Sequence, residues 1–302
     1  MSRDNLAGDL AGNALGALAE DHDDARWAYG TGFHDPLAGL DTAVPDGVDG
    51  DALAAYCLML GDDALIMSHR LQEWCAHAPE LEEEVALANI ALDLLGQARL
   101  LLTRAGQADG TGRTEDDLAF FRDAGEFRNV RLAEAPRGDF AFCVVRLLVF
   151  ATWRLALLDR LTASRDPVLA AVAAKGVKEV AYHRDHAAMW TIRLGDGTAE
   201  SRRRMAGALA AVWPLTGELF APHDVERRMA ERGLGVDPST VRAEFDQVIA
   251  EVLAAATLPV PDPAGTPHEP GRSGRDGVHS EEFHALLAEL QSVARAHPGA
   301  TW

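Results

Sequence analysis

The stretch from residue 60 to residue 102 determines the architecture predicted for this chain. It reads LGDDALIMSHRLQEWCAHAPELEEEVALANIALDLLGQARLLL, which is two helical patterns joined by a short link at Ala78-Pro79. In the second pattern, apolar residues recur every three or four positions, at Leu87, Ile90, Ala91, Leu94, Leu95, Ala98, Leu101 and Leu102. This spacing is typical of an amphipathic helix. Because the link is short, we expect the two helices to form an antiparallel hairpin.

Similar patterns lie on both sides of this hairpin. Long helices are predicted over 51–77, 79–102, 139–163 and 166–194, and shorter ones over 114–124, 199–233 with a break near Pro214, 238–256 and 280–296. The third long segment, FAFCVVRLLVFATWRLALLDRL, is apolar on nearly every side, so we expect it at the centre of the fold. The sequence therefore predicts an all-α protein, a four-helix bundle with accessory helices.

The first 50 residues differ in composition from the rest. They contain ten acidic residues against two arginines and are rich in Gly and Asp. Such a segment buries little apolar surface, so we expect residues 1–50 to form an acidic, partly disordered arm. The bundle domain is predicted over 51–302, with its last helix following a Pro/Gly-rich connector at 257–277.

Composition also excludes some classes of partner and location. The formal net charge is −19, which argues against nucleic acid, because binding to polyphosphates requires a basic surface. No uninterrupted apolar run approaches the roughly 18 residues of a membrane span, and the first residues lack the apolar core of a secretory signal. Three cysteines without a CxxC spacing suit a reducing compartment. We expect a soluble, cytoplasmic protein without a membrane partner.

Helical bundles often hold metal ions between their helices. Di-iron and di-manganese carboxylate proteins use one Glu from each of two helices and a Glu-x-x-His pair from each of the other two. In this chain the first helix offers Asp62 and Asp63, which could face position 93 across the hairpin. The second has Asp93-Leu-Leu-Gly96 where Glu-x-x-His is required, and glycine has no ligand atom.

The other two long helices are equally incomplete. The third has no carboxylate between Phe140 and Leu158, and the fourth offers Glu179 and His183 one turn apart, with His186 following. The candidate set is therefore Asp63, Asp93, Glu179 and His183. Three interpretations remain open: a vestigial or mononuclear metal site, a buried network of hydrogen bonds and ion pairs that includes Arg146 or Lys178, or side chains that never meet.

Clustered arginines are the remaining feature of interest. Arg202–Arg204 and Arg227–Arg228 are basic groups on an acidic chain. They are suited to an anionic partner, although solvated helix faces show the same pattern more often.

Three segments resemble a known family. These are residues 60–102, KEVAYHRDHAAMWTIRLGDGT at 178–198 and GRDGVHSEEFHALLAELQSVARAHPGATW at 274–302. They are similar to the C-type subunits of phenylacetyl-CoA epoxidases, the ring-epoxidising multicomponent oxygenases of bacterial phenylacetate breakdown. The resemblance runs from about residue 50 to the end, and the LDLLGQAR segment at 92–99 is its most specific part.

This resemblance implies a ferritin-like bundle without a working di-iron centre and without a cofactor of its own. In the family, a related catalytic subunit (the A type) holds the irons and binds the CoA thioester, further subunits complete the complex, and a reductase with FAD and iron–sulfur centres supplies electrons from NADPH. The chain is then expected to be a scaffold that is inactive alone, pairing with the di-iron catalytic subunit through outward apolar positions on its first two helices. Two alternatives are a free-standing metal-dependent oxidase or hydroxylase and a non-catalytic CoA-thioester-binding bundle.

Overall fold

The computed structural model describes residue 37, residues 39–261 and residues 271–300. Contacts divide the chain into two units, Met1–Ala38 and Gly39–Trp302, and all helices named below belong to the second. Most of the predicted acidic arm and part of the predicted connector lie outside the described residues. The partial disorder proposed for the arm therefore stays a prediction.

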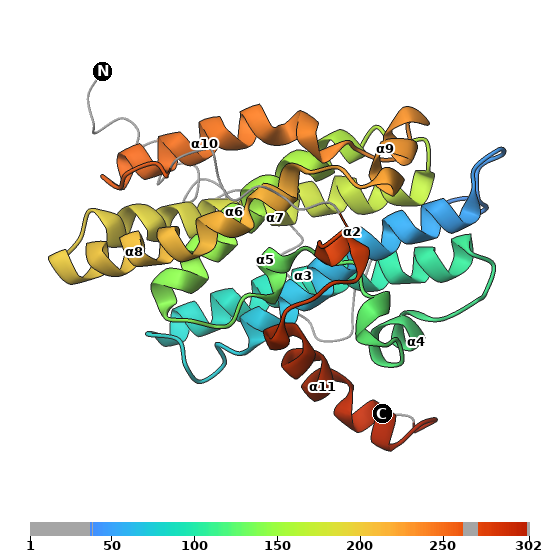
Figure 1. The fold of residues 1–302 in the computed structure, drawn as a ribbon, viewed down its shortest axis with the longest axis horizontal. Helices are drawn as coiled ribbons and strands as arrows, with labels where there is room; N and C mark the ends of the chain where they lie inside the picture. The colour runs from blue at the N-terminus through green and yellow to red at the C-terminus, as the bar shows by residue number, and fades with distance from the viewer. Residues whose placement is uncertain (1–36, 38, 262–270, 301–302) are drawn as a thin grey trace. The chain divides into compact units, whose positions relative to one another are not determined.

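Four long helices form the bundle (Figure 1). They are α2 (Gly50–Gln72), α3 (Leu81–Ala108), α6 (Phe140–Leu161) and α7 (Pro167–Gly195). Helix α2 packs on α3, α6 packs on α7, and α3 also packs on α7. All regular secondary structure among the described residues is helical, which confirms the predicted all-α, ferritin-like four-helix bundle.

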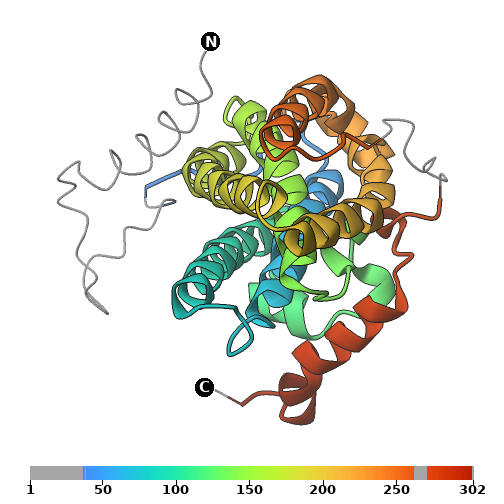
Figure 2. The same ribbon diagram turned by 90° about the vertical axis from the view of Figure 1, so that its left-hand side faces the viewer.

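Accessory helices cover much of the remaining surface of the bundle. They are α4 (Glu115–Phe120), α5 (Arg131–Glu134), α8 (Ala199–Val212), α9 (Asp224–Glu231), α10 (Arg242–Ala255) and α11 (Glu281–Ala296). Helices α8 and α10 pack on α6 and α7, α9 packs on α2, and α11 packs on α4. In both views α10 (orange) and α11 (red) lie on opposite sides of the bundle (Figures 1 and 2).

Aspartate caps set where three of the long helices begin. The carboxylate of Asp49 accepts a hydrogen bond from the first turn of α2, and Asp139 and Asp166 do the same for α6 and α7. A side-chain acceptor at this position satisfies a backbone N–H that has no partner within the helix. The predicted starts of these helices therefore agree with the structure. Helix α2 ends at Gln72, before the predicted residue 77, because residues 73–77 form turns.

The apolar helices α3 and α6 are buried to very different extents. Both are long and apolar enough to span a membrane by length and composition, although charged residues interrupt the apolar run of each helix. In α6, 89% of the most apolar 18-residue window is buried, so this helix forms the core, as predicted. In α3 only 44% of the corresponding window is buried. Helix α3 therefore presents apolar side chains outward as well as inward.

Candidate functional site

Polar side chains from α3, α6 and α7 meet inside the bundle. The Arg154 guanidinium of α6 donates from Nε to Gln97 Oε1 at 2.9 Å and from Nη1 to the Leu60 carbonyl at 3.3 Å. The Gln97 amide donates in turn to Glu179 Oε2 at 2.9 Å. The other oxygen of Glu179 pairs with Lys175, one turn earlier on α7. Both carboxylate oxygens of Glu179 are thus used by the chain itself.

Asp63 of α2 is held by a residue from the far end of the chain. Its carboxylate is fully buried and accepts hydrogen bonds from Arg275 at 2.8 and 3.0 Å and from the Val130 N–H at 2.8 Å. Burial by itself lowers the pKa of Arg275, but the carboxylates of Asp63 and Glu226 outweigh it and raise that pKa above its ordinary value. Arg275 is therefore a permanent cation. Burial raises the pKa of the Asp63 carboxyl, and the charge and hydrogen bonds of Arg275 act against this rise.

Asp62 does not face position 93, contrary to the prediction. Its fully buried carboxylate accepts hydrogen bonds from Arg122 and from the Arg128 N–H. Both of these residues lie in the segment between α4 and α5. The two aspartates of the first helix therefore bind arginines of later segments.

His183 and Asp93 are the two candidate residues that the structure brings into contact. His183 is buried, and its Nε2 lies 3.0 Å from Asp93 Oδ2 on α3. A second pair follows farther along the same two helices, where His186 Nε2 lies 3.2 Å from Glu83 Oε2. The structure thus shows two imidazole–carboxylate pairs along the α3–α7 seam, and the sequence identified only the first.

The four candidate residues do not converge on one point. Asp63 binds Arg275, Glu179 binds Gln97 and Lys175, and Asp93 binds His183. Within residues 39–261 and 271–300, no group of three or more His, Cys, Asp or Glu side chains is arranged to hold a metal ion.

The cations predicted for this network differ from those that the structure places there. Arg146 donates to the Ala135 and Pro136 carbonyls rather than to any of the four candidates. In the part of the chain that the structure describes, the basic partners of these candidates are Arg275, Lys175 and His183, and Lys178 is not among them. The network is therefore built from cations that the sequence did not single out for this role.

These residues do not fit the carboxylate-bridged metal pair that the bundle fold implies. Such a pair requires several free carboxylates around the cations, because hard oxygen ligands must neutralise them. Here Asp63 already has a guanidinium counterion, and Gly96 supplies no donor atom. In addition, α6 contributes Arg154 to the centre where a carboxylate would be required, and a guanidinium repels a metal ion.

Acidification is expected to destabilise the chain through His186. Burial, followed by the neighbouring charge of His183, lowers the pKa of His186 to about 4, and Glu83 beside it has its own pKa raised by burial. Protonation is thus easier in the unfolded chain, so stability is lost as pH falls from about 6.5 towards 4. We expect wild type to lose about 2 kcal/mol more than His186→Gln between about pH 6.5 and 4.5. Urea unfolding at several pH values measures this, and parallel curves for the two proteins would contradict it.

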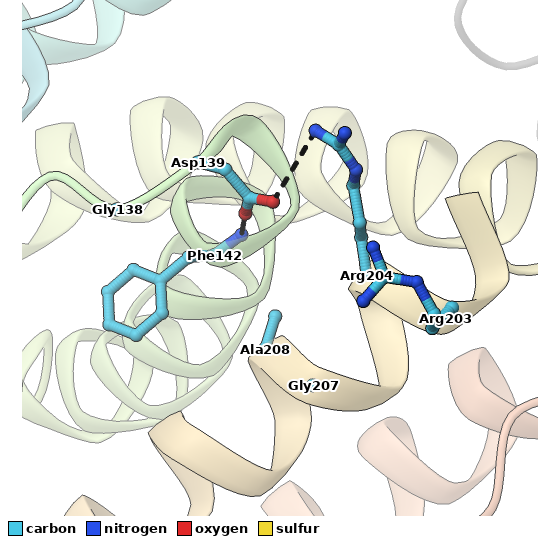
Figure 3. Close-up of a pocket in the computed structure, with 7 residues that line it drawn as sticks. All are labelled: Gly138, Asp139, Phe142, Arg203, Arg204, Gly207 and Ala208. Carbon is cyan, nitrogen blue, oxygen red and sulfur yellow. Dashed lines mark hydrogen bonds and ion pairs between the residues drawn. The ribbon is translucent and has the colours of Figure 1, made fainter. Parts of the chain in front are cut away.

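The cleft in Figure 3 lies between the start of α6 and helix α8. It has a volume of about 350 Å³ and is lined by Gly138, Asp139, Phe142, Arg203, Arg204, Gly207 and Ala208. Both arginines pair with Glu200, and Arg204 also faces Asp139 at 3.8 Å (Figure 3). The cations of this cleft already have carboxylate partners. The arrangement therefore gives no support to a site for the phosphates of CoA.

Comparisons with known proteins agree with the resemblance seen in the sequence. The chain is 44% identical over 250 residues to the C-type subunit of 1,2-phenylacetyl-CoA epoxidase from Escherichia coli (strain K12), a match that covers 83% of this chain and 99% of that protein. Residues 41–302 match the family described as "Phenylacetic acid catabolic protein", so the match begins within the predicted arm. Together with the helical bundle, these matches show that the chain belongs to the phenylacetic acid catabolic protein family.

Proposed function

We propose that this chain is the non-catalytic scaffold subunit of a phenylacetyl-CoA epoxidase and pairs with the di-iron catalytic subunit in aerobic phenylacetate breakdown. The observation that carries the proposal is the internal pairing of its core carboxylates. Arg275 binds Asp63, and Gln97 and Lys175 bind Glu179. Carboxylates that already have counterions within the chain are poor iron ligands. The similarity to a protein named as one subunit of an epoxidase supports membership of a complex of this kind.

The cofactors of the reaction then reside in other subunits. The proposal places the two irons in the catalytic subunit, and FAD, the iron–sulfur centre and the NADPH site in the reductase. A free-standing oxidase or hydroxylase is disfavoured by the unsuitable donor set. A CoA-thioester-binding bundle is disfavoured because both arginines of the described cleft are paired.

An exposed apolar surface supports the pairing with another subunit. Five large apolar side chains of α3 and α7 are more than half exposed: Leu81, Val85, Leu92, Tyr182 and Met189. We call them the α3–α7 face. The three residues of α3 lie on one side of that helix, because they are separated by one and by two helical turns. Large apolar side chains exposed together on one side of a helix mark an interaction site.

The location of this face differs from the expected one. The sequence predicted outward apolar positions on the first two helices, but most of α2 is buried beneath other elements. Helix α7, the fourth long helix, takes its place beside α3. The occupant that we propose is a helical surface of the di-iron catalytic subunit, because the exposed row of Leu81, Val85 and Leu92 along α3 has the spacing of a helix-packing surface.

Substitution on the α3–α7 face tests the pairing. The double variant Leu92→Glu/Met189→Glu places two charges where the partner requires apolar surface, and we expect its affinity for the di-iron catalytic subunit to fall about 100-fold or more. Val293→Glu is the matched control, because Val293 is equally exposed but lies on α11. Both proteins should retain the wild-type Tm, since neither change touches the core.

Affinity capture of the co-expressed di-iron partner, followed by titration of the purified chains, measures the effect. Retention of wild-type affinity in the double variant would place the interface elsewhere. The non-catalytic half of the proposal has its own measurement, the iron content of the chain purified alone after iron supplementation. We expect less than about 0.1 iron per chain, and about two irons per chain would contradict the proposal.

A further inference from the structure

We propose that Arg154 supplies the positive charge that the carboxylates at the centre of the bundle require, and that the space it fills is a binding site for a guanidinium-type cation. This inference concerns the core of the chain and does not depend on the identity of the partner. It starts from the mismatch between this core and a metal site. A carboxylate-bearing bundle requires a cation at its centre, and here one of the four helices carries that cation as a side chain.

The surroundings of Arg154 suit a guanidinium group, with acceptors for Nε and Nη1 but none for Nη2 among the described residues. Its side chain is 1% exposed, and two nitrogens donate to acceptors on different helices, Gln97 on α3 and the Leu60 carbonyl on α2. A guanidinium is planar and presents its N–H groups in a fixed fork, so it reaches two acceptors at once. A lysine ammonium at the end of a flexible stem lacks this geometry. The ring of Phe150 lies 5.8 Å from the guanidinium carbon and adds a weaker cation–π contact.

The charges around Arg154 favour a cation at this position. Its Nε donates to Gln97, and the Gln97 amide donates in turn to Glu179, so one amide links the guanidinium to a carboxylate of α7. The carboxylates of Asp63 and Glu179 both oppose the effect of burial on the pKa of Arg154. Removing the guanidinium takes a positive charge away from both carboxylates.

Chemical rescue tests this inference in the full-length chain. Arg154→Ala removes the two methylenes and the guanidinium that N-ethylguanidinium would restore. We expect about 10 mM N-ethylguanidinium to raise the Tm of this variant by about 2 °C, because a ligand that binds only the folded state stabilises it. Denaturation by a guanidinium salt is negligible at that concentration. Wild type should not respond, because its site is filled.

N-ethylurea is the matched control ligand, since it has nearly the same shape and no charge. An equal rise in Tm with N-ethylurea, an equal rise in wild type, or no rise in the variant would each overturn the inference. Arg99→Ala is the control variant, because Arg99 is 66% exposed on α3 and pairs with Glu115 at the surface. Its Tm should be insensitive to both compounds.

A second pair of variants covers the case in which Arg154→Ala does not fold. Arg154→Lys keeps the charge without the fork, whereas Arg154→Met keeps a stem of similar volume without the charge. We expect the Tm values to fall in the order wild type, Arg154→Lys, Arg154→Met. A methionine variant as stable as the lysine variant would show that the core does not require a cation, and would overturn the inference.

Discussion

Replacing Arg275 with methionine is expected to lower the free energy of unfolding by about 4 kcal/mol. The Arg275 side chain is 4% exposed and is the counterion of Asp63, whose carboxylate is fully buried. Methionine fills much of the same space, so the loss reports on charge and hydrogen bonding. Removing one member of a buried ion pair leaves the other charged in a medium of low polarity, which costs far more than the pair itself contributes.

The effect is large because Arg275 joins several parts of the chain. Besides Asp63, its guanidinium donates to the carbonyls of Met59 and Arg128 at 3.0 and 2.6 Å and lies 3.7 Å from Glu226. Loss of these bonds also leaves backbone acceptors without their partner. We therefore expect the substitution to loosen the attachment of residues 271–280 to α2.

Urea unfolding followed by circular dichroism measures this change. Arg227→Met is the matched control, because Arg227 pairs with Asp224 at the surface, where an ion pair contributes little, and should shift stability by less than about 0.5 kcal/mol. Adding Asp63→Asn to Arg275→Met should recover part of the loss, because it removes the unpaired carboxylate. A loss below about 1 kcal/mol in Arg275→Met would contradict this account of the core.

Replacing Asp166 with alanine is expected to cost about 4 kcal/mol of unfolding free energy, for two separate reasons. One Asp166 oxygen caps α7 by accepting from the Leu169 N–H at 2.8 Å. The other pairs with Arg104 of α3, and both side chains are fully buried. The variant thus loses a helix cap and leaves the Arg104 guanidinium with only the Thr42 and Ala43 carbonyls as partners among the described residues.

Asp139→Ala separates these two contributions. Asp139 caps α6 in the same way, accepting from the Phe142 N–H at 2.9 Å, but its side chain is 45% exposed and its cation partner, Arg204, is exposed as well. We expect this control to cost about 1 kcal/mol, which is typical of a helix cap. Equal losses in the two variants, measured by urea unfolding, would show that the pairing of Asp166 with Arg104 contributes nothing.

The same aspartates show how much of the fold follows from local sequence. Asp139 and Asp166-Pro167 predicted the starts of α6 and α7, because a cap and a proline in the first turn act through neighbouring residues only. The repeat of apolar residues from Leu87 to Leu102 predicted α3 and its inward side for the same reason. The resemblance to the epoxidase family was likewise readable from contiguous segments, and the comparisons confirm it.

The candidate site was predicted less completely. Gly96 and the carboxylate-free third helix predicted an incomplete set of metal ligands, and Asp93 was expected among the neighbours of His183, which it contacts. The cations that hold the aspartates of α2 were missed, as were the hydrogen bonds of Arg154. Arg275 lies 212 residues from Asp63 in the sequence, and Arg122 lies 60 residues from Asp62.

The sequence by itself determined the four long helices, their order and the family, because hydrophobic periodicity, caps and short links act over a few residues. Only the tertiary structure decided which cation neutralises each buried carboxylate and which apolar side chains stay exposed on α3 and α7. The sequence around an arginine does not show whether its side chain will lie in solvent, as that of Arg227 does, or in the core, as that of Arg275 does. Its electrostatic role is set by the surroundings that distant segments build around it, since burial strengthens Coulomb interactions and removes the competition from water.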